Sequence, residues 1–205
     1  MNEISIEAKE KRNAATSSVI AAIFLTSFKF IVGITTGSLG ILSEALHSLL
    51  DLIAAGITFF AVNISDKPPD EDHQFGHGKF ENLSAFFETI LLIITCVWII
   101  QEAIKRLTTG ETEIVVNVWS FIVLITAIVI DFSRSRLLLK TAKKYHSQAL
   151  EADGLHFSTD ILSSSVVLIG IICSSFGLYF VDSIASLGVA VIVLYISYNI
   201  GKRSI

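Results

Sequence analysis

The stretch Gly40-Ile-Leu-Ser-Glu-Ala-Leu-His47-Ser-Leu-Leu-Asp51 places a histidine and an aspartate four positions apart inside an apolar segment. A second pair with the same spacing follows later in the chain, in Leu155-His156-Phe-Ser-Thr-Asp160. On a helix, residues four positions apart share one face, so each segment presents one imidazole and one carboxylate to a single point. Two such faces, brought together, would form a cage of two nitrogen and two oxygen ligands. The spacing therefore predicts two helices that meet at a metal site.

Both pairs lie where charge is costly. A carboxylate in the middle of a bilayer-spanning helix costs on the order of 3 kcal/mol on insertion scales, so a favourable interaction must offset that cost. A bound cation would do so. The alternative is that each histidine only satisfies the aspartate of its own helix.

The composition is typical of a polytopic membrane protein. Hydrophobic residues make up 52% of the chain and charged residues only 17%, which is unlike a soluble domain of this length. The net charge of −4 comes without a basic stripe of interleaved aromatic residues, so we expect no nucleic-acid partner. The first twelve residues are charged and polar, which predicts that no cleavable signal peptide precedes the first span.

Six apolar segments are long enough to cross a hydrocarbon core of roughly 30 Å, which predicts an all-α bundle of six transmembrane helices. Their approximate bounds are 14–36, 41–64, 83–103, 114–132, 149–176 and 183–200. We expect residues 1–13 to form a cytoplasmic N-terminal segment, 14–200 the transmembrane domain and 201–205 a cytoplasmic tail. Turns are expected at 36–40 and 177–182, and a basic linker at 133–147.

The distribution of lysine and arginine predicts the orientation of the bundle. With the N-terminus inside, the outer loops carry only Lys105 and Arg106, whereas the inner segments carry nearly all the other basic residues. Because cytoplasmic segments are enriched in lysine and arginine, both termini are predicted to be cytoplasmic.

The polar loop after the second span holds a second group of candidate ligands. Pro68 and Pro69 end the preceding helix, and Asp70, His73 and His77 follow closely. Imidazole and carboxylate groups are zinc ligands, so these three residues form a possible cytoplasmic metal site. The alternative is an ordinary solvated polar surface.

Three further ionisable residues lie in or near the spans. Lys29 is expected to reach the membrane interface or a carboxylate on a neighbouring helix. Glu44 is expected to be an entrance carboxylate or the polar contact of Lys29. Asp131 lies at the end of the fourth span, where a surface ion pair with Arg134 or Arg136 is the better interpretation.

With these motifs in place, the chain resembles the cation diffusion facilitator family of zinc-transporting proton antiporters. The resemblance covers nearly the whole chain. It rests on the His47 and Asp51 pair and on three motifs: Thr36-Gly37-Ser38, Asp70-Glu-Asp-His73-Gln-Phe-Gly-His77-Gly-Lys79-Phe-Glu81 and Ser147-Gln-Ala-Leu-Glu-Ala-Asp153-Gly-Leu-His156-Phe-Ser-Thr-Asp160.

The resemblance implies a transport site and a loop site, with the ligands His47, Asp51, His156 and Asp160 in the first and Asp70, His73 and His77 in the second. It also implies a homodimer in the cell membrane, the inner membrane of a prokaryote. Family members usually continue into a cytosolic domain resembling a metallochaperone, which we expect this chain to lack. Many bacterial members have aspartate in place of His47, so the histidine indicates the zinc-selective branch rather than cadmium transport.

These features predict a secondary transporter, not an enzyme, that exports a divalent cation from the cytoplasm in exchange for protons. Two imidazoles and two carboxylates suit the tetrahedral preference of Zn²⁺, and no cofactor beyond the transported metal is expected. The ligands bind metal only when deprotonated, so protonation would release the ion.

Other readings remain beside this one. Fe²⁺, Mn²⁺, Co²⁺ or Ni²⁺ could occupy the same ligands, and the chain could instead be a metal-binding membrane sensor or structural subunit. A membrane metalloenzyme is disfavoured because four protein ligands leave no open position for water.

Overall fold

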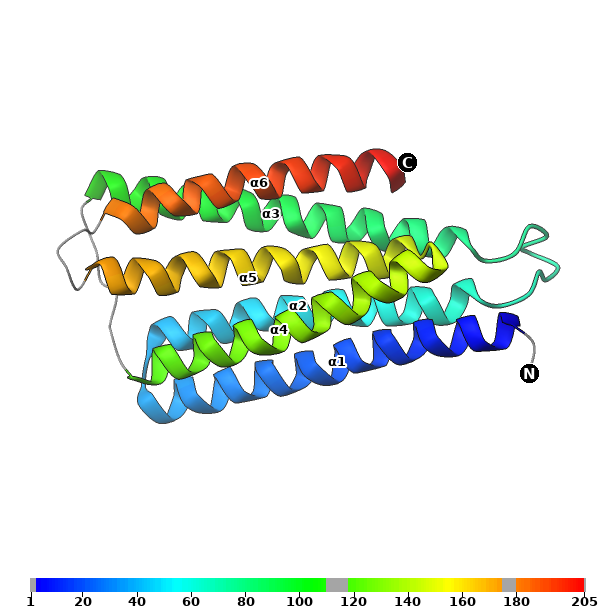
Figure 1. Ribbon diagram of the computed structural model, residues 1–205, viewed down its shortest axis with the longest axis horizontal. Coiled ribbons are helices and arrows are strands. Elements are labelled where there is room, and N and C mark those ends of the chain that lie inside the picture. The colour runs from blue at the N-terminus through cyan, green and yellow to red at the C-terminus, as the bar shows by residue number, and fades with distance from the viewer. Residues whose placement is uncertain (1–2, 110–117, 175–179, 205) are drawn as a thin grey trace.

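The computed structural model describes residues 3–109, 118–174 and 180–204, and six helices connected by turns and loops make up these ranges. They are α1 (Glu3–Thr36), α2 (Leu39–Ser65), α3 (Lys79–Thr109), α4 (Val118–Tyr145), α5 (Gln148–Ser174) and α6 (Phe180–Ser204). The helices run side by side along the long axis of the bundle (Figure 1). The all-α prediction is confirmed. Three expected features lie partly outside the described residues: the start of the fourth span at 114–117, the end of the fifth span at 175–176 and the first half of the turn at 177–182. The second half of that turn, 180–182, is instead the start of α6.

Local sequence explains where two of the helices meet. Gly37 has a φ of +66°, a left-handed conformation that glycine adopts at little cost, and it ends α1. Ser38 is the N-cap of α2, because its side chain accepts a hydrogen bond from the Ile41 amide. The expected turn is therefore present, and it makes α1 and α2 an antiparallel pair.

The basic segment 133–147 is not the linker that we expected, because most of it forms the last turns of α4. Leu138 and Ala142 lie on its buried face. Arg134 is buried too, whereas the other basic side chains lie on the opposite, exposed face, namely Arg136, Lys140, Lys143 and Lys144. The segment is thus an amphipathic extension of a spanning helix, and only His146 and Ser147 separate it from α5.

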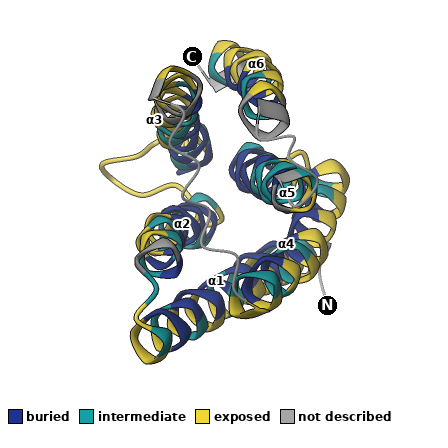
Figure 2. Ribbon diagram, turned by 90° about the vertical axis from the view of Figure 1, so that its left-hand side faces the viewer, coloured by how far each residue is buried: buried dark blue, intermediate teal, exposed yellow. Residues whose placement is uncertain are grey.

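The two helices that carry the histidine and aspartate pairs lie in the middle of the bundle. Helix α1 packs mainly against α2, α4 against α5, and α3 against α6. Seen from the end, α2 and α5 lie between the α3–α6 pair and the α1–α4 pair (Figure 2). Both central helices also contact α3 and each other. Their facing sides are therefore enclosed by the other helices.

The partition of side chains is that of a membrane protein. Large apolar residues such as Ile31, Phe60 and Tyr195 are more than half exposed, whereas many alanines and polar side chains are buried together with larger apolar residues such as Leu92 and Phe157. By length and composition, three of the described helices can cross a membrane, in the ranges Ile6–Thr36, Ile41–Ser65 and Lys79–Lys105. The chain is a multi-pass integral membrane protein. The count of six spans stays a prediction.

Both described ends of the chain lie toward the same end of the bundle, together with the loop between α2 and α3 (Figure 1). The α1–α2 turn lies at the opposite end. This arrangement agrees with termini on one side of the membrane. That this side is the cytoplasm stays a prediction from the charge pattern.

Candidate metal centre

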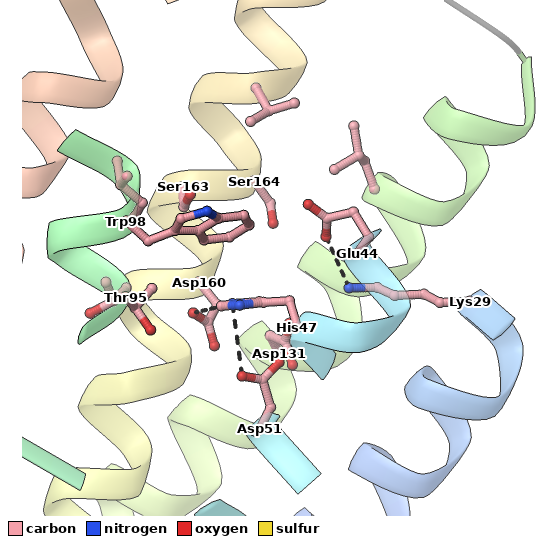
Figure 3. A pocket seen from close by; sticks show the side chains of 14 residues that line it. Lys29, Glu44, His47, Asp51, Thr95, Trp98, Asp131, Asp160, Ser163 and Ser164 are labelled. Carbon is pink, nitrogen blue, oxygen red and sulfur yellow. Dashed lines mark hydrogen bonds and ion pairs between the residues drawn. The ribbon is translucent and has the colours of Figure 1, made fainter. Parts of the chain in front are cut away.

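The structure brings all four predicted membrane residues together between α2 and α5 (Figure 3 labels three of them). Nε2 of His156 lies 3.3 Å from Oδ1 of Asp51 and 3.5 Å from Oδ2 of Asp160. Nε2 of His47 lies 3.8 Å from Oδ1 of Asp51 and 3.9 Å from Oδ1 of Asp160. We call His47, Asp51, His156 and Asp160 the membrane quartet. Each imidazole contacts the carboxylates of both helices, so the alternative in which each histidine pairs only within its own helix is wrong.

These distances can be compared with a tetrahedral zinc site. Zinc bonds of about 2.0–2.2 Å to nitrogen and oxygen require ligand atoms roughly 3.3–3.6 Å apart. The two contacts of His156 fall in that range, and the two contacts of His47 are slightly longer. Asp51, His156 and Asp160 offer three ligand atoms within 4.8 Å of one another, and His47 lies beside this group, in contact with both carboxylates.

Small residues allow the central helices to approach their neighbours. Gly154 lies two positions before His156, and a Cβ atom there would come within 2.9 Å of the Leu139 side chain on α4. On α2, Ala54 and Ala55 are fully buried beside Asp51. Close packing at small residues is the usual basis of helix association in membranes. It fixes the backbone positions from which the four ligands project.

A cavity of about 60 Å³ lies on one side of the quartet (Figure 3). Its lining runs from Asp51 back to Glu44 on α2 and from Thr159 forward to Val167 on α5. Both directions lead toward the end that holds the α1–α2 turn. On the other side of the quartet, Thr58, Glu88 and Asp153 are fully buried. The cavity therefore extends from the quartet toward one end of the bundle, and fully buried polar residues lie on the other side.

Two side chains in this cavity behave as predicted. Nζ of Lys29 lies 3.3 Å from Oε2 of Glu44 and donates to Oγ of Ser48 at 2.7 Å. The lysine thus reaches a carboxylate on the neighbouring helix, and that carboxylate lines the cavity (Figure 3).

The indole of Trp98 stacks on the His47 ring, with 6.0 Å between the ring centroids. Trp98 was not singled out in the sequence, since an aromatic residue in an apolar span carries no signal of its own.

The prediction for Asp131 is correct in its partner and wrong in its place. Nη1 of Arg134 donates to Oδ1 of Asp131 at 3.0 Å, but both residues are buried rather than at the surface. Nη2 of Arg134 donates to Oγ of Ser18, which in turn donates to Oδ2 of Asp153, and the guanidinium lies over the Phe157 ring. The arginine is thus the centre of a buried network beside the site, which balances carboxylates in the bundle interior.

The loop residues also come together. Nδ1 of His73 lies 3.1 Å from Oδ1 of Asp70, and Nε2 of His77 lies 3.2 Å from Oδ2 of the same carboxylate. We call Asp70, His73 and His77 the loop cluster. The His73 backbone amide donates to the Asp70 carboxylate, which lowers the pKa of that carboxyl below its ordinary value. A carboxylate that stays ionised and two adjacent imidazoles are suited to a divalent cation.

Another polar cluster, which the sequence did not indicate, joins four segments at the end of the bundle near the termini. Nζ of Lys11 lies 2.5 Å from Oδ1 of Asp66 and 3.1 Å from Oε1 of Glu81. Ser147 donates to the other carboxylate oxygen of Glu81. We call Lys11, Asp66, Glu81 and Ser147 the clasp. It connects α1, the end of α2, the start of α3 and the α4–α5 turn.

The fold and the site define a helical integral membrane protein with a buried group of nitrogen and oxygen ligands. Comparison with known proteins agrees with this class. Residues 15–205 match the cation efflux transmembrane domain. An uncharacterized transporter of Methanocaldococcus jannaschii is 38% identical over 183 residues, which cover 89% of this chain and 64% of that protein. The cation-efflux pump FieF of Yersinia pestis is 31% identical over 196 residues, which cover 94% of this chain and 64% of the pump.

The chain belongs to the cation efflux family, also called the cation diffusion facilitators. The family is one of transporters, and the resemblance seen in the motifs is confirmed. The chain spans 64% of the length of these relatives.

Proposed function

We propose that this chain carries the transport path of an exporter that moves a divalent cation, Zn²⁺ in the first place, out of the cytoplasm in exchange for protons. The membrane quartet is the cargo site. The observation that carries this proposal is that Asp51, His156 and Asp160 offer ligand atoms within 4.8 Å of one another inside a membrane bundle, with Nε2 of His47 3.8–3.9 Å from both carboxylates. Four ligands of this type match the tetrahedral preference and borderline softness of Zn²⁺.

The exchange with protons follows from the chemistry of the ligands. Imidazole and carboxylate bind a metal ion only in their deprotonated forms, so binding releases protons and protonation expels the ion. A proton gradient across the membrane can therefore drive the cation in the opposite direction if the site is exposed to each side in turn.

The cavity supports a specific place in this cycle. It connects the quartet to the end of the bundle with the α1–α2 turn, which the charge pattern assigns to the outside. On the other side of the quartet, fully buried residues and the clasp lie between the site and the end of the bundle that holds the termini. We therefore assign this structure to the outward-facing state, in which protons enter and the ion leaves.

The test is Zn²⁺ flux into proteoliposomes with an imposed pH gradient. The wild-type chain is compared with Asp51→Asn, which removes one ligand charge from the quartet. Glu10→Gln is the matched control, because it also neutralises a carboxylate but lies exposed on α1 in an ion pair with Lys144. We expect gradient-driven flux in the wild type and in the control, and none in Asp51→Asn. Equal flux in Asp51→Asn and the wild type would mean that the quartet is not part of the transport path.

The choice of metal is tested in the same vesicles. Flux of Zn²⁺, Fe²⁺, Co²⁺, Ni²⁺ and Mn²⁺ is measured one ion at a time and then in competition, since raw affinity alone would follow the Irving–Williams order. We expect Zn²⁺ to be carried fastest and to suppress the flux of the others. A faster flux of Mn²⁺ or Fe²⁺ in competition would mean that this ion, and not zinc, is the cargo of the same site.

A further inference from the structure

The imidazole of His156 has two different faces. Its Nε2 faces the two carboxylates of the membrane quartet, as described above. Its Nδ1 faces away from the quartet, toward Oε2 of Glu88 on α3 at 3.5 Å. Within the described residues, neither His156 Nδ1 nor Glu88 Oε2 has a hydrogen-bond partner. Each of these buried atoms therefore has the other as its nearest opposite group.

The Glu88 side chain is held in this place from its other oxygen. Glu88 is fully buried, and its Oε1 accepts a hydrogen bond from the Thr58 hydroxyl of α2 at 3.3 Å. The same hydroxyl lies 3.3 Å from Oγ of Ser84, one turn earlier on α3. A carboxylate buried at this depth is costly unless both of its oxygens find partners. The Thr58 contact serves one oxygen and leaves the other for His156.

We propose that Glu88 is a positioning residue for the transported cation. It accepts a hydrogen bond from Nδ1–H of His156, which places the ring proton on Nδ1 and leaves the lone pair of Nε2 directed at the centre of the quartet. This proposal rests on the function proposed above. Histidine ligands generally donate their second nitrogen to a carboxylate or carbonyl, and loss of that partner typically costs 10–100-fold in metal affinity.

The arrangement is specific to one of the two histidines. His47 has Asp51, Asp160 and the Trp98 ring around it, and its side chain is about one-fifth exposed to the cavity. His156 is nearly fully buried and has a carboxylate behind it. We therefore expect His156 to be the fixed ligand of the site and His47 the ligand that moves as the ion enters or leaves.

The test measures metal binding rather than transport. It uses purified protein in which His73→Ala and His77→Ala have removed the loop cluster, so that only the membrane quartet binds. In this background, Glu88→Ala removes the acceptor, Glu88→Gln keeps an acceptor oxygen without the charge, and Thr89→Val is the control. The Thr89 hydroxyl bonds only to the Ala85 carbonyl of its own helix among the contacts described. Zn²⁺ affinity is measured by competition with a chelator, and the visible spectrum of bound Co²⁺ reports the ligand geometry.

We expect Glu88→Ala to weaken Zn²⁺ binding by about 10–100-fold and to change the Co²⁺ spectrum. Glu88→Gln should recover most of the affinity, and Thr89→Val should match the background protein. Unchanged affinity and spectrum in Glu88→Ala would overturn the proposal. An equal loss in Glu88→Gln and Glu88→Ala would also overturn it, because charge alone would then explain the effect.

A measurement on zinc-loaded protein with native Glu88 keeps the test independent of how well the variants fold. The ¹⁵N resonances of His156 should show a proton on Nδ1 and the metal on Nε2, and a proton on Nε2 would overturn the proposal. His156→Ala separates this inference from the cargo site. If His156→Ala binds Zn²⁺ normally, the cargo site itself is wrong. If it does not bind but Glu88→Ala does so normally, only the positioning role is wrong.

Discussion

The membrane quartet and the loop cluster use the same chemical groups in opposite surroundings. In the quartet, helices α2 and α5 enclose the ligands, and His156 has a carboxylate behind it. In the loop cluster, Asp70 and His73 are exposed and only His77 is buried. An enclosed site can be opened to one side at a time, whereas an exposed site stays in equilibrium with one compartment. The comparison teaches that the two clusters offer a metal ion the same kinds of ligand and differ in enclosure, which is the property that the proposed transport requires.

The largest expected effect is on turnover at the quartet. His156→Ala should reduce Zn²⁺ flux in proteoliposomes by at least about 100-fold, because it leaves three ligands and an unpaired Glu88 in the interior. His146→Asn is the control, since His146 is exposed, lies outside both clusters and has a φ of 53° that asparagine tolerates. Flux retained in His156→Ala would mean that the quartet is not required for transport, so that the two sites would not differ in this respect.

A change of selectivity should be smaller than a loss of turnover. His47→Asp replaces an imidazole with a carboxylate at the quartet and keeps four ligands. We expect the ratio of Cd²⁺ to Zn²⁺ flux to rise by about tenfold, on the order of 1.4 kcal/mol in relative transition-state energy. Flux of the two ions in the same vesicles gives the ratio directly. An unchanged ratio would mean that His47 does not contribute to selectivity.

The loop cluster should affect concentration dependence rather than maximal rate. The double variant His73→Ala, His77→Ala is expected to raise the Zn²⁺ concentration at half-maximal flux by about three- to tenfold and to leave the maximal flux near the wild-type value. The physical reason is that a site open to one compartment can supply ions without taking part in the crossing itself. A loss of maximal flux as large as that of the quartet variants would make the two sites equivalent and end the comparison.

The smallest expected effect concerns pH at the loop cluster. Because the pKa of Asp70 is held below its ordinary value, this carboxylate is ionised throughout the range from pH 5.5 to 8. Its charge would be lost only as the pH falls through that lowered pKa. Asp70→Asn should therefore weaken Zn²⁺ binding by a few-fold across the range, because it removes a charge that is present at every pH in it. The measurement is a Zn²⁺ titration at several pH values in a protein whose quartet is disabled by Asp51→Ala, with and without Asp70→Asn. Equal affinities with and without Asp70→Asn at every pH would mean that the Asp70 carboxylate does not contribute to binding at the loop cluster.

Much of the site was predictable from the sequence because it depends on the helical repeat. The two pairs at i and i+4 had to project from one face of each helix. Lys29 and Glu44 lie at similar distances from the turn at Gly37, so an antiparallel pair of helices brings them together. Local spacing and one turn were sufficient for these contacts.

The contacts that were missed depend on how each helix is rotated about its own axis. Asp131 was expected to pair with Arg134 or Arg136, and Arg134 is its partner, but the sequence did not show that this face of α4 points inward toward Ser18. The contact between Glu88 and His156 joins helices that are distant in the chain, and so does the ion pair between Lys11 and Glu81 in the clasp. Tertiary packing alone decides such contacts, and no short-range pattern in the sequence indicates them.

The closed path between the quartet and the clasp has a consequence for the efficiency of exchange. Protons move along chains of water, so any wet gap there while the cavity is open would let them cross without an ion moving the other way. Such a leak would dissipate the gradient in proportion to the time spent in this state. Thr58, Glu88 and Asp153, below the quartet, are fully buried, and Oε2 of Glu88 and Oδ1 of Asp153 have no hydrogen-bond partner among the described residues. The tightness of this layer would therefore set how many protons the cell spends for each cation that it removes.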